Sequence, residues 1–100
     1  MIILNEQKQS WERYLYTADC TAGLPDGVTV ISATVSSIEC LNAPADTALT
    51  ADSPLIVASP SVQVWLNAGT NGCKYKVTLY IICSNTQRIE AEIILKIKNL

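Results

Sequence analysis

Histidine is absent from this 100-residue chain, so the side chain that most often acts as a general acid or base near neutral pH is missing. No segment approaches the run of about 20 apolar residues that a membrane-spanning helix needs. The start of the chain lacks the basic cluster and the small-residue cleavage site of a secretory signal. These absences predict a protein that is not an enzyme, does not cross a membrane and is made inside the cell.

Paired cysteines of the C-x-x-C type are also missing, although the chain contains Cys20, Cys40, Cys73 and Cys83. A zinc site normally takes two ligands that are close in sequence, so this spacing argues against one. The acidic loop residues lack the regular spacing of calcium ligands, and we expect no metal or other cofactor. Buried thiols in a reducing compartment act as small hydrophobic groups. If a disulfide forms after release from the cell, Cys20 and Cys83 are the pair to test.

Basic residues are missing between Tyr14 and Cys73, where five carboxylates give a net charge of −5. Residues 74–100 carry five basic residues against two glutamates, for a net charge of +3. This asymmetry indicates either two ordinary solvated surfaces or complementary faces that meet between neighbouring subunits. The seven basic residues form no cluster, which argues against a nucleic-acid partner.

Alternation of apolar and polar residues dominates the second half of the chain and predicts strands at 61–67, 73–83 and 89–97. The last two should pair as a hairpin around residues 84–87. We expect the hairpin's inner face to include Tyr75, Val77, Leu79, Ile81 and Cys83. Tyr75 follows a glycine-containing turn in the manner of a tyrosine corner, so its hydroxyl is expected to bond to a nearby backbone carbonyl.

The first half is less regular. Residues 28–38 are rich in β-branched side chains and predict a long strand, with Ile31, Ala33 and Val35 facing inward and a face switch or bulge near Val30. Residues 13–20 predict a further strand, and residues 41–60 predict short strands and loops.

Forty-nine per cent of the residues are hydrophobic, enough for one domain of this length to bury a core. About seven short strands predict an all-β, immunoglobulin/fibronectin-III-like sandwich of antiparallel strands over residues 13–100. Residues 1–12 are expected to form an N-terminal arm. Its apolar residues Ile2, Ile3 and Leu4 should add a strand to the chain's own sheet or to that of a neighbour.

Outward-facing aromatic and aliphatic residues are the candidates for an interface. Trp65 lies between Val64 and Leu66 on the polar face of its strand, so it either covers the edge of the sandwich under a loop or anchors a partner. Tyr80, Ile82 and Ile94 lie on the outward faces of the final hairpin. We predict that these three form one apolar patch that contacts another subunit.

Residues 16–35 resemble the pattern Y-x-x-D-W-x-x-W-L-x-x-G-D-x-I, and residues 62–78 are similar to the pattern V-x-V-W-L-x-G-G-T-x-G-x-x-Y-x-V-T. By these two segments the chain resembles the small tailed-phage proteins called fibre-tail adaptor proteins, in which the first pattern is the opening. The strand at 88–97 continues the match. The chain departs from the family pattern at Cys20 and Gly23, where the family usually has tryptophan, and at Val28, where it has aspartate.

The resemblance implies a non-enzymatic virion structural protein with an immunoglobulin-like fold, assembled in the host cytoplasm. Its expected place is the head–tail connection, the tail or a fibre. Its expected partners are head, connector, tail or fibre subunits and further copies of itself. Two alternatives remain open: a capsid decoration (cement) protein, and a carbohydrate-binding surface module in which Trp65 and Tyr80 stack on sugar rings.

Overall fold

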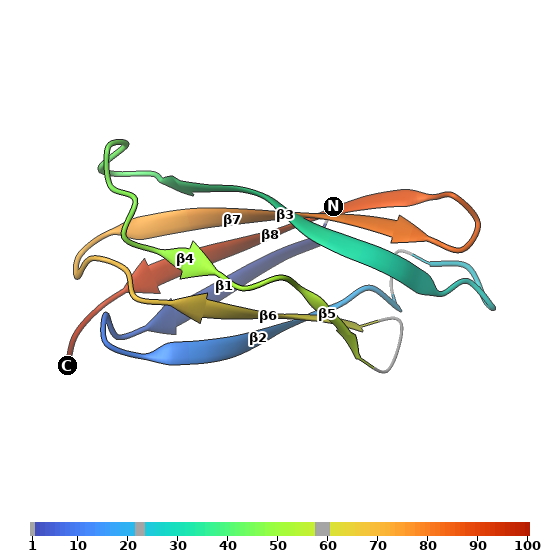
Figure 1. Cartoon of the computed structure of the whole chain (residues 1–100), viewed down its shortest axis with the longest axis horizontal. Helices are drawn as coiled ribbons and strands as arrows, with labels where there is room; N and C mark the ends of the chain where they lie inside the picture. The colour runs from blue at the N-terminus through green and yellow to red at the C-terminus, as the bar shows by residue number, and fades with distance from the viewer. Residues whose placement is uncertain (1, 22–23, 58–60) are drawn as a thin grey trace.

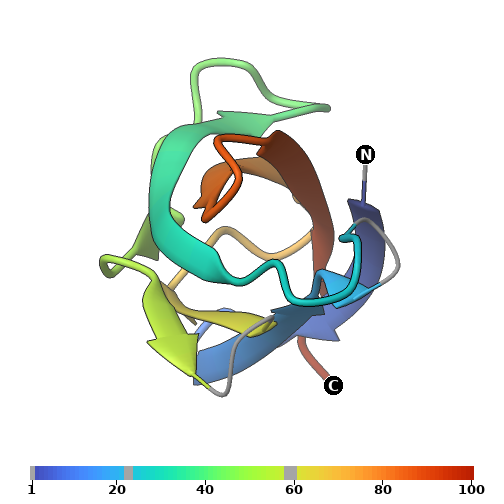
Figure 2. The same ribbon diagram turned by 90° about the vertical axis from the view of Figure 1, so that its right-hand side faces the viewer.

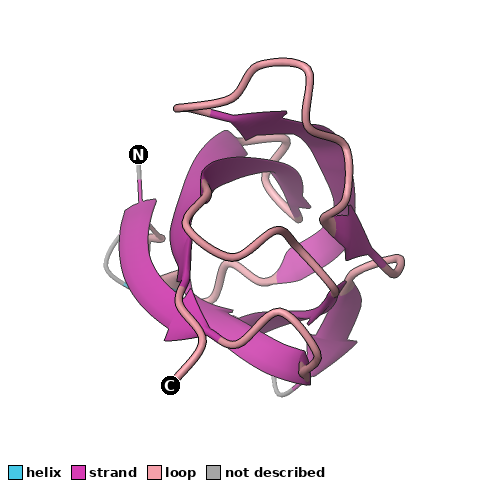
Figure 3. Cartoon of the chain, turned by 90° about the vertical axis from the view of Figure 1, so that its left-hand side faces the viewer, coloured by secondary structure: helices cyan, strands magenta, loops and turns pink. Residues whose placement is uncertain are grey.

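Eight β-strands and no α-helix make up the part of the chain that the computed structural model describes, residues 2–21, 24–57 and 61–100. The strands run along the longest axis of a body that measures 42 × 22 × 20 Å (Figure 1). Loops join the strands mainly at the two ends of this axis (Figure 1), and Figure 3 looks onto one of these ends. The strands are β1 (Ile2–Lys8), β2 (Arg13–Asp19), β3 (Val30–Cys40), β4 (Thr50–Ala51), β5 (Leu55–Val57), β6 (Ser61–Asn67), β7 (Lys74–Cys83) and β8 (Arg88–Ile97).

The strands form two sheets that enclose the core (Figure 2). One sheet has the order β1-β8-β7-β3, and the other has the order β2-β6-β4, with β5 also paired to β6. The expected all-antiparallel arrangement is wrong at one pair, because β1 runs parallel to β8. Strand direction reverses at each connection except the one between β4 and β5, which run the same way along β6 (Figure 1). The last strand therefore runs in the direction of the first.

The predicted hairpin is confirmed. β7 and β8 pair antiparallel from Lys74↔Lys96 to Ile82↔Arg88. Their apolar positions alternate with polar ones, as a half-buried sheet requires. The inner faces of both sheets supply the buried core, which includes Tyr16, Val62, Val64, Leu66, Tyr75, Val77, Leu79, Ile81, Ile93, Leu95 and Ile97.

The N-terminal residues pair within the chain, which is the first of the two alternatives for this segment. β1 lies beside β8 with Ile2 opposite Ala91 and Leu4 opposite Ile93. Ile2 and Leu4 are half-buried against the core, and Ile3 between them is exposed. Only Ile3 of the three apolar residues is therefore available on the surface.

A β-bulge changes the face of β3 at its start. Val30 is opposite Cys83 and Ser32 is opposite Ile82, which leaves Ile31 as the extra residue between them. Val30 is buried, and Ile31 is 59% exposed. The predicted face switch is confirmed, but the inward placement of Ile31 is wrong, because the bulge turns that side chain outward.

Tyr75 lies at the start of β7 with its ring in the core and its hydroxyl at the end of the sandwich. The hydroxyl accepts a hydrogen bond from the N–H of Thr70 (2.9 Å) and donates one to Oδ1 of Asp46 (2.6 Å). The expected carbonyl partner is therefore wrong. The turn presents an amide to the hydroxyl, and the phenolic proton goes to a carboxylate, which is a stronger acceptor than a carbonyl.

All four cysteines are free and buried. Cys20 and Cys83 are both fully buried in the core, and burial raises the pKa of the Cys20 thiol. Burial also raises the pKa of the Cys73 thiol, which lies near Cys40. The cysteines thus fill core positions as thiols in this structure.

Candidate protein-interaction site

Three large side chains gather on the outer face of the β1-β8-β7-β3 sheet. Tyr80 and Ile82 point outward from β7 and are 53% and 40% exposed. The bulge in β3 places Ile31 next to the Ser32↔Ile82 pair. We call Ile31, Tyr80 and Ile82 the Tyr80 patch. An exposed apolar cluster of this kind is typical of a contact surface.

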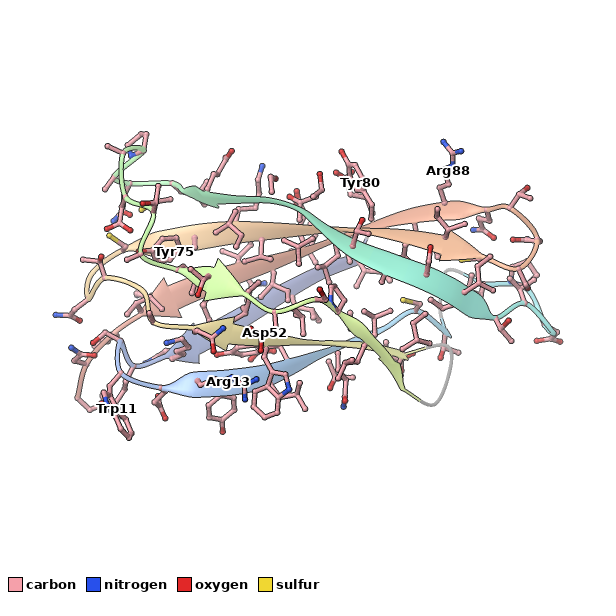
Figure 4. The ribbon with its side chains drawn as sticks, viewed as in Figure 1. Trp11, Arg13, Asp52, Tyr75, Tyr80 and Arg88 are labelled. Atoms are coloured by element: carbon pink, nitrogen blue, oxygen red, sulfur yellow. The ribbon has the colours of Figure 1, made fainter. Side chains whose placement is uncertain are left out.

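Charged residues of β8 border the Tyr80 patch. Arg88 lies opposite Ile82, and Glu90 lies opposite Tyr80. Figure 4 shows that Tyr80 and Arg88 both project from the same side of the sheet. Tyr80, Arg88, Ile89 and Glu90 line a shallow depression of about 270 Å³. The depression therefore offers an aromatic face, a cation and a carboxylate beside the exposed residues of the patch.

Ile94 is not part of this patch, which corrects the prediction of a single apolar surface. Ile94 lies opposite Lys76, four residues along β7 from Tyr80, or about 13 Å at the usual rise of a strand. It is half-buried and lines a separate groove of about 530 Å³ with Asn5, Glu6, Gln7, Lys74 and Lys96. Alternation in the sequence correctly predicted that Ile94 faces outward, but it did not predict how far Ile94 lies from Tyr80 along the sheet.

Trp65 lies on the opposite sheet and is half-buried by a neighbouring side chain. The guanidinium carbon of Arg13 is 4.0 Å from the centroid of the Trp65 ring. Nη2 of Arg13 also contacts Oδ2 of Asp52 at 2.6 Å, and this hydrogen bond lowers the pKa of Asp52. Figure 4 shows Arg13 and Asp52 together at the β2–β6 face. The indole points away from the core, as predicted, but one of its faces is covered by Arg13.

Trp11 is the surface residue that the sequence analysis missed. It lies in the turn between β1 and β2 and is 93% exposed. Figure 4 shows it projecting from one end of the long axis. A tryptophan isolated between polar residues, outside any strand alternation, was the signal in the sequence that pointed to it.

The described residues contain no group of three or more cysteine, aspartate and glutamate side chains placed to hold a metal ion. Within the same residues, no helix is long and apolar enough to cross a membrane.

A two-sheet domain with aromatic and aliphatic residues on its outer faces is typical of proteins that act by contact with other proteins. Comparison with family models identifies which kind. Residues 8–96 match the model described as Podophage GP4 fiber-tail adaptor protein gp77, and the chain belongs to this family. The predicted resemblance is confirmed, and the family gives the protein a structural role as a component of the phage virion. No match was found among curated proteins.

Proposed function

We propose that this chain is a non-enzymatic adaptor that joins a fibre to the phage tail and acts only through protein contacts. Membership of the fibre-tail adaptor family supports the role. The observation that carries the proposal is the Tyr80 patch, where three large side chains are exposed on one face of a domain whose core is already complete. Burial of such side chains against a partner removes apolar surface from water, which favours binding.

We also propose that the chain associates with further copies of itself, assembles in the host cytoplasm and lies at the tail. The uneven charge supports contacts between subunits. Lys74 and Lys96 lie directly opposite each other on β7 and β8, and both are exposed. Like charges in that position weaken a sheet unless a partner neutralises them.

We further propose that the sandwich belongs to the immunoglobulin class. Three observations support this assignment. The strands β8, β7 and β3 are neighbours in one sheet, and β2 and β6 pair in the other, as the corresponding strands do in immunoglobulin domains. Tyr75 also bonds back to the backbone of Thr70, five residues upstream, as in a tyrosine corner.

The carbohydrate-binding alternative is not favoured. Trp65 and Tyr80 lie on the outer faces of different sheets, so they cannot form one stacking platform for a sugar. The guanidinium of Arg13 also covers one face of the Trp65 ring.

Incorporation into particles tests the proposed function. Particles assembled with the variant Tyr80→Ser/Ile82→Ser should contain much less of the adaptor and fewer fibres than particles assembled with the original chain. The variant Thr17→Ser, on the other sheet, is the matched control. Immunogold labelling should place the original chain at the tail. Labelling spread over the head would instead indicate a decoration protein, and unchanged incorporation of the double variant would reject the Tyr80 patch as a contact.

A further inference from the structure

The turn that carries Trp11 is held in place by hydrogen bonds on both sides. The N–H of Gln9 donates to Oε1 of Glu12 at 2.7 Å, which closes the turn. The N–H and hydroxyl of Ser10 both donate to Oδ1 of Asn99, at 2.8 and 2.9 Å, which ties the turn to the C-terminal segment. Because the backbone of the turn is held, binding has to order only the side chain of Trp11. The structure thus presents an indole that is 93% exposed on a fixed turn.

The chain also contains a surface whose chemistry suits an indole. In the depression beside the Tyr80 patch, the Arg88 guanidinium can lie over an aromatic face. The Glu90 carboxylate can accept from an indole N–H, and Ile89 and the ring of Tyr80 supply apolar contact. The depression has a volume of about 270 Å³, just below the roughly 300–1,000 Å³ of small-molecule sites.

The two features cannot meet within one chain. Trp11 projects from one end of the long axis, whereas Tyr80 and Arg88 lie in the other half, on the opposite side of the sandwich (Figure 4). A contact between two different surfaces of identical chains is heterologous, and it leaves one free donor and one free acceptor at the ends of every assembly that does not close into a ring.

We propose that Trp11 of one copy docks into the depression beside the Tyr80 patch of a second copy. This inference rests on the self-association included in the proposed function, and it names the residues on both sides of that contact. Docking one aromatic side chain buries about 150–250 Å², much less than the 1,200–2,000 Å² of a stable interface. The contact is therefore weak between free chains and becomes strong where a particle holds many copies close together.

Sedimentation velocity over a rising concentration series of the purified chain tests the proposal. The original chain should show an average sedimentation coefficient that rises steadily with concentration. Trp11→Ala alone and Tyr80→Ser/Ile82→Ser alone should each remain monomeric. Tyr14→Ser removes another exposed aromatic residue near the turn and should associate like the original chain.

Mixing the two defective variants gives the decisive result. One retains an intact Tyr80 patch and the other retains Trp11, so an equimolar mixture should form dimers and nothing larger. A monomeric original chain at every concentration would overturn the proposal, and so would association of Trp11→Ala at the original strength. The adaptor role is read separately, by pelleting each variant with purified tails. Binding of monomeric Trp11→Ala to tails would sustain the adaptor function, whatever the result for self-contact.

Discussion

The hydroxyl of Tyr75 donates a 2.6 Å hydrogen bond to Oδ1 of Asp46, and this contact ties a loop to the start of β7 across 29 residues of sequence. Asp46 also accepts from the hydroxyl of Thr70 and from the N–H of Ala48. The hydrogen bonds from Thr70 and Tyr75 lower the pKa of Asp46 to about 2. Burial, followed by the bond to Asp46, raises the pKa of Tyr75 to about 12. The contact therefore stabilises the end of the sandwich when Asp46 is ionised and Tyr75 is protonated.

The first prediction is a loss of stability at both extremes of pH. The folded pKa of Asp46 is below its ordinary value of 3.8, so its contribution is present above pH 4 and is lost as the pH falls toward 2. The folded pKa of Tyr75 is above its ordinary value of 10, so its contribution is lost as the pH rises from 10 toward 12. Thermal melts across these ranges measure both effects.

The variants Asp46→Asn and Tyr75→Phe test the contributions of the two residues separately. Asp46→Asn should lower the melting temperature at pH 7 and reduce the dependence on pH between 4 and 2. Tyr75→Phe should lower the free energy of unfolding by about 1–3 kcal/mol, because the buried ring loses its hydrogen bond to a charged group. Equal melting temperatures for Asp46→Asn and the original chain at pH 7 would show that the contact carries no stability.

The second prediction concerns two glycines in the turn before β7. Gly69 and Gly72 both have positive φ, at +105° and +88°. A Cβ on Gly69 would lie 2.9 Å from the buried Cδ1 of Ile97, whereas one on Gly72 would meet nothing within 4 Å. Gly72→Ala should therefore cost only the backbone strain, about 1–2 kcal/mol.

Gly69→Ala should lower the free energy of unfolding by the same backbone strain and by a further amount of about 1–3 kcal/mol, because the new Cβ displaces the core side chain of Ile97. Urea unfolding of the two variants gives the difference directly. A larger loss for Gly72→Ala than for Gly69→Ala would contradict the packing argument.

Regular alternation made β6, β7 and β8 predictable, because each has one face in the core and one in solvent. The start of β3 was less predictable, since Val30 and Ile31 are both apolar and only the bulge decides which is buried. The Tyr80 patch followed from the pattern in part. Its third member is Ile31 instead of Ile94, because strand register and not residue type sets which side chains are neighbours.

Contacts between distant segments were beyond the sequence pattern. The parallel pairing of β1 with β8 depends on how the whole sandwich closes. The choice of Asp46 as the partner of Tyr75 depends on where a long loop folds back. Arg13 over Trp65 is a third case, because β2 and β6 had to be paired before the two residues could be seen as neighbours.

The third prediction is a measurable coupling between Arg13 and Trp65. A cation over an aromatic ring at an exposed site contributes about 0.5–1 kcal/mol. A double-mutant cycle of Arg13→Ala and Trp65→Ala, followed by urea unfolding, should return a coupling of that size. The ion pair of Arg13 with Asp52 is half-exposed, so the effect of Asp52→Asn should shrink in high salt while the coupling persists. A coupling near zero would leave Trp65 free to act as an interface anchor.

The fourth prediction is that native thiols are protected from reagents. Cys20, Cys40, Cys73 and Cys83 are all buried and free. A thiol reagent should therefore modify none of them rapidly in the folded protein and all four after denaturation without reductant. Modification of only two after denaturation would reveal a disulfide, and peptide mapping would show whether Cys20 and Cys83 form it.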